Sequence, residues 1–394
     1  MQKYIFDPEA YLSGNAFEWV VGGEPFFARL LQIITEAEQV IHFQVYIFDE
    51  DNTGKAVADA LKKASERGVE VYLAVDSYGS KSLSPRFVSD LEESGVHFRF
   101  FSPLPKHFYF FRLGRRLHNK AVVADHRVAL VGGINIADKY RGNRDEIPWL
   151  DFAIAVKGPV CSALSRVCER IYSEKYFGKH LLHHLGLSET PAGRMLGRLV
   201  VNDWFRRKNQ ISNGYRAACW KARESIVIVA SYFLPSRSMR AVLEKATQRG
   251  VKVVVLLPGE SDLPMAKRAT RYLYQWVLRN NIAIYEWDSS ILHAKLAVVD
   301  HTWVTIGSFN LNHLSQYSSI EMNIEVLDEA FARSVQDSLS VLISQAIPVT
   351  AKSFLHVRSI LDQILDWGSY TLARWIMLFL FFLVRRDQRY QEHG

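Results

Sequence analysis

Two short segments of the chain carry the same three polar residues at the same spacing. Residues 118–125 read HNKAVVAD and residues 293–300 read HAKLAVVD. Both are otherwise apolar, which is typical of a β-strand, and neighbouring side chains of a strand point to opposite faces. The histidine and lysine of each copy therefore share a face and can contact one ligand together. The aspartate points the other way, and we expect it to brace the strand or a neighbouring loop.

A glycine turn with an asparagine follows each copy at the same distance, GGIN at 132–135 and GSFN at 307–310. Glycine allows a tight bend or a close approach of the backbone to a ligand. Asn135 and Asn310 would add neutral donors beside the two cationic lysines. The candidate catalytic residues are His118, Lys120, Asp125, His293, Lys295 and Asp300.

Two histidines, two lysines and two asparagines together predict a site for one phosphate group. The donors and positive charges would meet the oxygens on which charge develops in the transition state. One histidine would attack phosphorus and the other would protonate the leaving oxygen. Each copy supplies only one histidine, so the two copies must face each other.

The repeat extends well beyond these motifs. Residues 60–75 (ALKKASERGVEVYLAV) match residues 242–257 (VLEKATQRGVKVVVLL), and each has a helical pattern, a glycine stop and an apolar strand. Other elements repeat in the same order. The predicted helix Pro25–Glu38 matches Gln210–Arg223. The predicted strand 40–48 matches 225–233, 96–101 matches 282–287, and 151–156 matches 321–326.

The alternation of strands and helices predicts an α/β fold of two similar α-β-α domains, related by a pseudo-two-fold axis with the site at their interface. We assign residues 1–177 to the first half and 210–346 to the second. The glycine-rich segment 178–209 has no strong period and is interpreted as a linker. Residues 347–394 form a C-terminal tail.

The duplicated HxKxxxxD pattern, with GGxN or GSxN after it, resembles the phospholipase D superfamily over roughly residues 15–345. The resemblance implies a phosphohistidine intermediate, phosphatidyl transfer or phosphodiester hydrolysis, and no metal or other cofactor. It makes His118 the nucleophile and His293 the general acid and then base. It also implies that an acid on the strand after each motif, Asp151 or Glu321, orients the histidine of its own half.

Within that superfamily the chain is similar to bacterial cardiolipin synthases. The strings that carry the likeness are YIFDEDNTGKAVADAL (46–61), VDSYGS (75–80), SYFLPSRSMRAVLEKA (231–246) and LPGESDLPMAKRATRYLYQWVL (257–278). Because Met1 lies close to the catalytic region, the branch without two N-terminal transmembrane helices fits best. In that family two phosphatidylglycerol molecules give cardiolipin and glycerol.

The charge and the aromatic segments favour a lipid surface as partner. The formal net charge is +7, which attracts anionic membranes or nucleic acid. The first motif is preceded by SPLPKHFYFFRLGRR (102–116), which has no counterpart in the second half. It is either a hairpin packed on the other half or a membrane-inserted lip. The predicted contacts in the lip are Phe108, Tyr109, Phe110, Phe111, Arg112, Arg115 and Arg116.

The tail is the second candidate membrane contact. WIMLFLFFLV (375–384), beginning at Trp375, is ten apolar residues flanked by arginines. As a helix it would cover about 15 Å, half of a hydrocarbon core of about 30 Å. We expect an amphipathic anchor at the cytoplasmic face of the cell membrane, with a spanning helix or a dimer or core helix as alternatives.

Three other functions remain open from the sequence. A phospholipase D hydrolase would use the same site with water as acceptor, and a nuclease of the superfamily would explain the basic charge, although we expect no nucleic acid. A lipid-binding scaffold with a decayed site is disfavoured, since all six motif residues are intact. His180, His183 and His184 have helical spacing, but no acidic or cysteine residues accompany them and we expect no metal site.

Overall fold

The computed structural model describes residues 6–103, 115–143, 145–173, 190–203, 206, 208–312, 319–356 and 359–391. Of residues 355, 356 and 376–391 it describes the backbone alone. The aromatic run Phe108–Phe111, Arg112 and the three histidines at 180–184 therefore lie outside the described residues.

The first half has a mixed sheet in which three parallel strands continue into three antiparallel ones. Strands β2, β3 and β4 pair in parallel, β2 also pairs with β6, and β6, β7 and β8 continue antiparallel. The elements are α1 (Glu24–Glu36), β2 (Val40–Val45), α2 (Asn52–Glu66), β3 (Glu70–Asp76), α3 (Pro85–Glu93), β4 (His97–Phe101), β6 (Ala121–Ala124), β7 (Val128–Gly132) and β8 (Phe152–Lys157).

The second half repeats this order. Strands β11, β12 and β13 pair in parallel, β11 pairs with β14, and β14, β15 and β16 continue antiparallel. Its elements are α6 (Gln210–Lys221), β11 (Ser225–Ala230), α7 (Arg237–Gln248), β12 (Lys252–Pro258), α8 (Pro264–Arg279), β13 (Ala283–Trp287), β14 (Lys295–Val299), β15 (Trp303–Gly307) and β16 (Ser319–Leu327). The two-fold repeat predicted from the sequence is thus present strand by strand.

The helix boundaries follow from local chemistry. The Asp51 side chain caps α2 by accepting from the Gly54 amide, and Ser84 caps α3 in the same way through Phe87. After α2 and α7 the chain turns at Gly68 and Gly250, which have φ of 92° and 87°. Glycine adopts this left-handed conformation without strain, so both predicted helix stops are confirmed.

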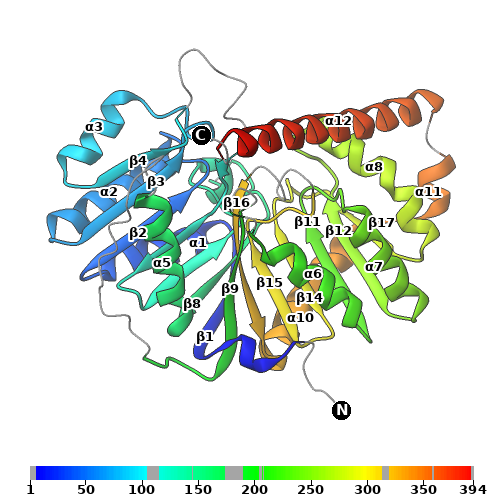
Figure 1. Ribbon diagram of the computed structural model, residues 1–394, viewed down its shortest axis with the longest axis horizontal. Helices are drawn as coiled ribbons and strands as arrows, with labels where there is room; N and C mark the ends of the chain where they lie inside the picture. Colours follow the sequence, from blue (N-terminus) through cyan, green and yellow to red (C-terminus); the bar gives the residue numbers. More distant parts are fainter. Residues whose placement is uncertain are drawn as a thin grey trace.

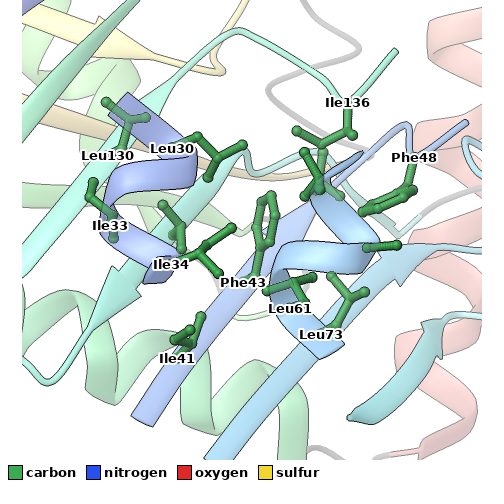
Figure 2. Close-up of a cluster of buried hydrophobic side chains, with 14 of the residues drawn as sticks. Leu30, Ile33, Ile34, Ile41, Phe43, Phe48, Leu61, Leu73, Leu130 and Ile136 are labelled. Carbon is green, nitrogen blue, oxygen red and sulfur yellow. The ribbon is translucent and has the colours of Figure 1, made fainter. Parts of the chain in front are cut away.

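The core of the first half lies between the sheet and helices α1 and α2. Figure 2 shows Leu30 and Ile34 of α1 on the side of the helix that faces Phe43 of β2, and Ile33 belongs to the same buried cluster. These four side chains are at most 3% exposed. Leu30, Ile33 and Ile34 have the spacing i, i+3, i+4, so they form one apolar stripe of α1 that covers the sheet. This packing fixes the strands that lead into the first motif.

Two strands missed by the sequence analysis join the halves into one continuous sheet. Strand β1 (Leu12–Val21) pairs with β8 and with β9 (Met195–Asp203), and β9 pairs along its length with β16. The interpretation of 178–209 as a linker is therefore wrong for Met195–Asp203. The nine residues lie inside the sheet, with β1 on one side and β16 on the other, and Val200 and Val201 contribute buried side chains to the cores.

The C-terminal segment is docked on the second half. Strand β17 (Ile347–Val349) extends the sheet at β13, and α11 (Ala351–His356) leads to the long helix α12 (Ile360–Gln391). Figure 1 shows α12 lying lengthwise along one side of the molecule, next to α8. Within the described part of the chain, no helix combines the length and the apolarity needed to cross a membrane.

Candidate active site

The two motif histidines lie where the halves meet. His118 follows the short strand β5 (Arg116–Leu117), which pairs with the start of β16, and its amide donates to Ile320 O at 3.0 Å. The amide of His293, just before β14, donates to Leu150 O at 2.8 Å. Each histidine is thus held by backbone from the opposite half, which confirms that the two copies face each other.

Each histidine is oriented by a carboxylate from the other half. His118 Nδ1 lies 2.9 Å from Glu321 Oε2, and His293 Nδ1 lies 2.7 Å from Asp151 Oδ2. The expectation that each acid serves the histidine of its own half is therefore wrong. The crossing follows from the strand pairing, since β16 brings Glu321 beside β5. With Nδ1 engaged, Nε2 of each ring is left for the substrate.

Two buried lysines flank the histidines. Lys120 Nζ donates to His118 O at 2.9 Å and lies 5.1 Å from the ring centre of Tyr46. Lys295 Nζ donates to Ser231 Oγ at 3.0 Å and contacts the carbonyl oxygen of His293. Burial lowers the pKa of Lys120 to about 7 and that of Lys295 to about 8. An anion between them would stabilise the protonated forms and raise both pKa values again.

Burial also governs the protonation of the histidines and of Asp151. It lowers the pKa of His118, against the effect of Glu321, and lowers the pKa of His293 well below its ordinary value. The two neighbouring lysines add to the effect on His293. Burial raises the pKa of Asp151 to about 7. The His293–Asp151 pair therefore tends to be neutral until negative charge enters the site.

Asp125 and Asp300 do not face the substrate. Asp125 accepts from the backbone amides of Glu38, Gln39 and Val40 at 2.7–2.9 Å. Asp300 accepts in the same way from residues 223–225. The bracing role expected from strand parity is confirmed, and their place among the catalytic residues is corrected: each fixes the turn after its motif strand to the start of a neighbouring strand.

The glycine turns pack closely against the start of β8 and against β16. A Cβ on Gly133 would lie 2.5 Å from both carboxylate oxygens of Asp151, and one on Gly307 would lie 2.1 Å from Met322 O. Both turns therefore need glycine for close approach. In the second half Ser308 stands in the place of Gly133, and its hydroxyl donates to Glu321 Oε2 at 2.5 Å.

The two asparagines are buried and differ in their contacts. Asn135 accepts from Ile47 N at 3.1 Å and donates to Tyr140 Oη at 2.8 Å. Its amide is thus used inside the protein, which is a correction to the predicted substrate contact. Asn310 is 4% exposed, and its Oδ1 has no protein partner in the described part of the chain. A substrate contact by Asn310 remains a prediction.

Two arginines predicted to contact lipid are engaged in the protein. Arg116 is 8% exposed and pairs with the buried Asp76 at 3.3 Å, and Arg115 pairs with Asp203 at 2.8 Å. Arg116 also donates to Ser102 O at 2.7 Å. Neither arginine lies free for a membrane surface, because the insertion that they end is anchored here to β3 and β9. Trp375, in contrast, is 67% exposed on α12.

An aromatic wall at the site has no signal in the sequence motifs. Tyr46 lies edge-on to His118 with 4.9 Å between ring centres, and Tyr140 and Trp149 lie 5.3 and 5.8 Å from His293. Tyr46 follows β2, whereas Tyr140 and Trp149 come from the segment between the GGIN turn and β8. The repeat gives no signal for Tyr46, because Ser231 stands at the equivalent place after β11 and contacts Lys295 there.

These residues place two buried lysines and three aromatic rings around two histidines, each of which uses Nδ1 for its carboxylate. Such a site can hold a phosphodiester, form a covalent bond from one histidine to phosphorus and exchange a proton through the other. Among the described residues, no cluster of three or more histidine, cysteine or acidic side chains has the arrangement of a metal site.

The comparisons with known proteins agree with this geometry. Relatives include cardiolipin synthase B of Salmonella typhimurium, 30% identical over 88% of this chain and 84% of the relative. The cardiolipin synthase of Clostridium perfringens (strain SM101) is 29% identical over 92% of this chain and 78% of the relative. The crystal structure of phosphatidylserine synthase from Haemophilus influenzae shares the fold, with a TM-score of 0.71 at 12% identity over 95% and 97% of the two chains.

The family model described as "Cardiolipin synthase, PLD-like domain" matches residues 30–152 and 216–343, where PLD stands for phospholipase D. The two matched segments contain both motifs and both orienting acids, one set in each half. The chain belongs to this family of phospholipase D-like proteins.

Proposed function

We propose that the protein is a phosphatidyltransferase of the cardiolipin synthase type. It transfers a phosphatidyl group from phosphatidylglycerol, or a related phospholipid, to a hydroxyl of a second phospholipid and releases glycerol. The observation that carries the proposal is the pair of facing histidines, each oriented by a carboxylate of the other half and flanked by a buried lysine.

In the first step His118 is the nucleophile. Its Nε2 attacks phosphorus, a nitrogen–phosphorus bond forms, and the bond from phosphorus to the glycerol oxygen breaks. Glu321 stabilises the positive charge that develops on the imidazole. His293 gives its Nε2 proton to the leaving glycerol, so that neutral glycerol departs.

The second step reverses the first with a new partner. The hydroxyl of the acceptor lipid gives its proton to His293 and attacks phosphorus from the side that glycerol has left. The nitrogen–phosphorus bond breaks and His118 is restored. Throughout, the cationic forms of Lys120 and Lys295 stabilise the negative oxygens of the phosphoryl group.

We place the enzyme at the cytoplasmic face of the membrane as a peripheral protein. The described part of α12 supports this placement, because its exposed side includes Leu361, Ile364, Leu365, Leu372 and Trp375. These positions are i, i+3, i+4, i+11 and i+14, which form one apolar helix face. A face of this kind binds in the headgroup region, and the net charge of +7 favours an anionic leaflet.

Incubation of the purified protein with phosphatidylglycerol vesicles tests the activity. Cardiolipin and glycerol in equal amounts are the expected products. Phosphatidic acid without cardiolipin would make the protein a hydrolase, and cleavage of single-stranded DNA with no lipid product would make it a nuclease. A His118→Ala variant that keeps full turnover would overturn the covalent mechanism.

A further inference from the structure

Lys139 is a cation at the rim of the site with no role in the steps above. It lies on the short helix α4 (Asp138–Arg141), which follows the first glycine turn. Its Nζ lies 4.8 Å from the ring centre of Trp149 and 5.6 Å from that of Tyr140. The side chain is half-buried, and no carboxylate of the described chain forms an ion pair with it. The aromatic rings hold the ammonium group by cation–π contacts and leave its protons for another acceptor.

The position of Lys139 is rigidly set. Asp138 accepts from the Thr53 amide at 2.8 Å, Arg141 pairs with Glu24 at 2.7 Å, and the Trp149 amide donates to Lys139 O at 2.9 Å. Three different parts of the first half thus hold the ends of α4. An ammonium group on such a support is preorganised for a ligand, since little side-chain freedom is lost on binding.

Lys139 belongs to the first half but lies on the side of the second-half histidine. Both rings beneath it are packed against His293, at 5.3 and 5.8 Å between ring centres. The positive charge of Lys139 also helps to lower the pKa of His293. The segment that presents it, residues 136–150, has 15 residues, whereas its counterpart, residues 311–320, has 10. The site is therefore asymmetric on this side.

The proposed mechanism gives that side of the site a specific occupant. His293 protonates the leaving glycerol and later deprotonates the acceptor, so both groups lie on its side of the phosphorus atom. The leaving glycerol is neutral. The acceptor lipid carries a second phosphate, which is separated from the reacting hydroxyl by one glycerol unit.

We propose that Lys139 binds the phosphate of the acceptor phospholipid and so selects a lipid over water or free glycerol in the second step. This inference rests on the proposed transferase function. Loss of a charge-assisted contact of this kind corresponds to a decrease of about 10-fold or more in acceptor use. It acts only on acceptors that carry a phosphate.

The test uses a phosphatidyl-p-nitrophenol donor with labelled acyl chains and compares two acceptors. With phosphatidylglycerol as acceptor the product is cardiolipin, and with free glycerol it is phosphatidylglycerol. For Lys139→Gln we expect a loss of about 10-fold in kcat/KM for phosphatidylglycerol as acceptor. The first phase of nitrophenol release, which forms the phosphohistidine, and transfer to free glycerol should each change by less than about two-fold, because neither involves a second phosphate.

Two further variants separate the charge from the fold. Lys139→Arg keeps the cation over the rings and should retain most of the cardiolipin activity. Lys245→Gln is the matched control, since Lys245 lies 5.0 Å from the ring centre of Trp220 on the outer helix α7 and should have no effect. Circular dichroism of each variant checks that the fold is intact.

The outcomes distinguish the inference from the proposed function. If Lys139→Gln lowers transfer to both acceptors equally, or to neither, the acceptor-phosphate site is wrong while the transferase assignment stands. If the wild-type protein makes no cardiolipin from phosphatidylglycerol or from phosphatidyl-p-nitrophenol as donor, the transferase assignment fails and this inference fails with it.

Discussion

The two histidines of the site have different surroundings, and the difference fits their different roles. Glu321 is held by the Ser308 hydroxyl as well as by His118, and its carboxylate is fixed as the partner of one ring. Asp151 accepts from its own neighbour, the Phe152 amide, and its raised pKa of about 7 lets the His293 pair hold a proton near neutrality. The fixed carboxylate of Glu321 can stabilise His118 when its ring becomes cationic as the nucleophile. The proton shared between Asp151 and His293 can be given to the leaving group and taken back from the acceptor.

The crossed carboxylates make a prediction at the level of single residues. Nitrophenolate is a good leaving group that needs no proton, so formation of the phosphohistidine from phosphatidyl-p-nitrophenol should depend on His118 and its partner alone. Glu321→Gln should slow the release of nitrophenolate by about 10²-fold or more. Asp151→Asn should leave the first release nearly intact and block the second step. Stopped-flow absorbance measures the two phases.

A serine beside one acid offers a matched control for that experiment. Ser308→Ala removes one hydrogen bond to Glu321 and should slow the first phase more mildly than Glu321→Gln does. The opposite result, with Asp151→Asn slowing the first phase and Glu321→Gln sparing it, would mean that His293 is the nucleophile or that each acid orients the histidine of its own half, and either would overturn the assigned roles.

The buried lysines predict that anion binding takes up protons. Lys120, with its pKa of about 7, is largely neutral at pH 8, whereas a bound phosphodiester would raise that pKa and protonate it. At pH 6 the lysine is already charged and no proton is needed. Affinity for a short-chain phosphatidylglycerol should therefore fall as the pH rises from 6.5 to 8.5.

Calorimetry in two buffers of different ionisation enthalpy counts these protons. Proton uptake at pH 8 should decrease in Lys120→Met, since the neutral side chain cannot be charged. Equal uptake by the wild type at pH 6 and pH 8 would show that neither lysine titrates between them.

At the level of elements, the sequence patterns predicted the repeated strands and helices. They did not predict which strands pair between the two halves. Gly68 and Gly250 mark helix ends in any context, and the paired strings at 60–75 and 242–257 reveal the repeat. The pairing of β9 with β16 depends on residues more than 100 positions apart. Nothing in the sequence of 195–203 distinguishes a central strand from a connecting segment.

The same limit applies to the site. Spacing alone predicted that His118 and Lys120 act together and that Asp125 turns away. It could not show which carboxylate reaches which histidine, because that depends on the pairing of β5 with β16. Arg116 illustrates the opposite error, since its neighbours in the sequence suggested a lipid contact while the fold pairs it with Asp76.

The exposed apolar face of helix α12 leads to a prediction about bilayer binding. One side packs on α8, where Arg268 reaches Asp366 at 3.4 Å and Tyr370 stacks on Tyr272. The other side exposes Leu365 and Leu372. The double change Leu365→Asn and Leu372→Asn should weaken binding to phosphatidylglycerol vesicles by about 10-fold or more, since each buried leucine contributes about 1.5–3 kcal/mol. Vesicle sedimentation measures the bound fraction.

An exposed valine elsewhere provides the control for the α12 prediction. Val341 is 58% exposed on α10 (Glu329–Gln345), and Val341→Asn should leave vesicle binding unchanged. If the leucine variant instead changes the oligomeric state by size-exclusion chromatography and not the vesicle binding, the apolar face is a contact between copies of the chain.

At the level of the whole molecule, the site exists only where the halves meet. The central core contains Phe152 and Ile154 of the first half together with Leu296 and Met322 of the second. Both histidines take their orienting carboxylate across the same boundary. Helix α12 packs close to this site, because Tyr370 and Ala373 contact the cluster that contains Leu234, and Leu234 lies three residues after Ser231, the partner of Lys295. Helix α12 and the residues around His293 are thus supported by the same part of the second half.

The dependence of each half on the other can be tested with two fragments, 1–177 and 190–394. Alone, each fragment exposes the core face described above and carries one histidine without its acid, so we expect neither to be stable or active. Expressed together, they should copurify and form cardiolipin, since the β1–β9 and β5–β16 pairings join the two fragments and need no covalent link. His118→Ala in the first fragment should abolish that activity. Activity of either fragment alone would mean that one half forms a complete site by pairing with a copy of itself.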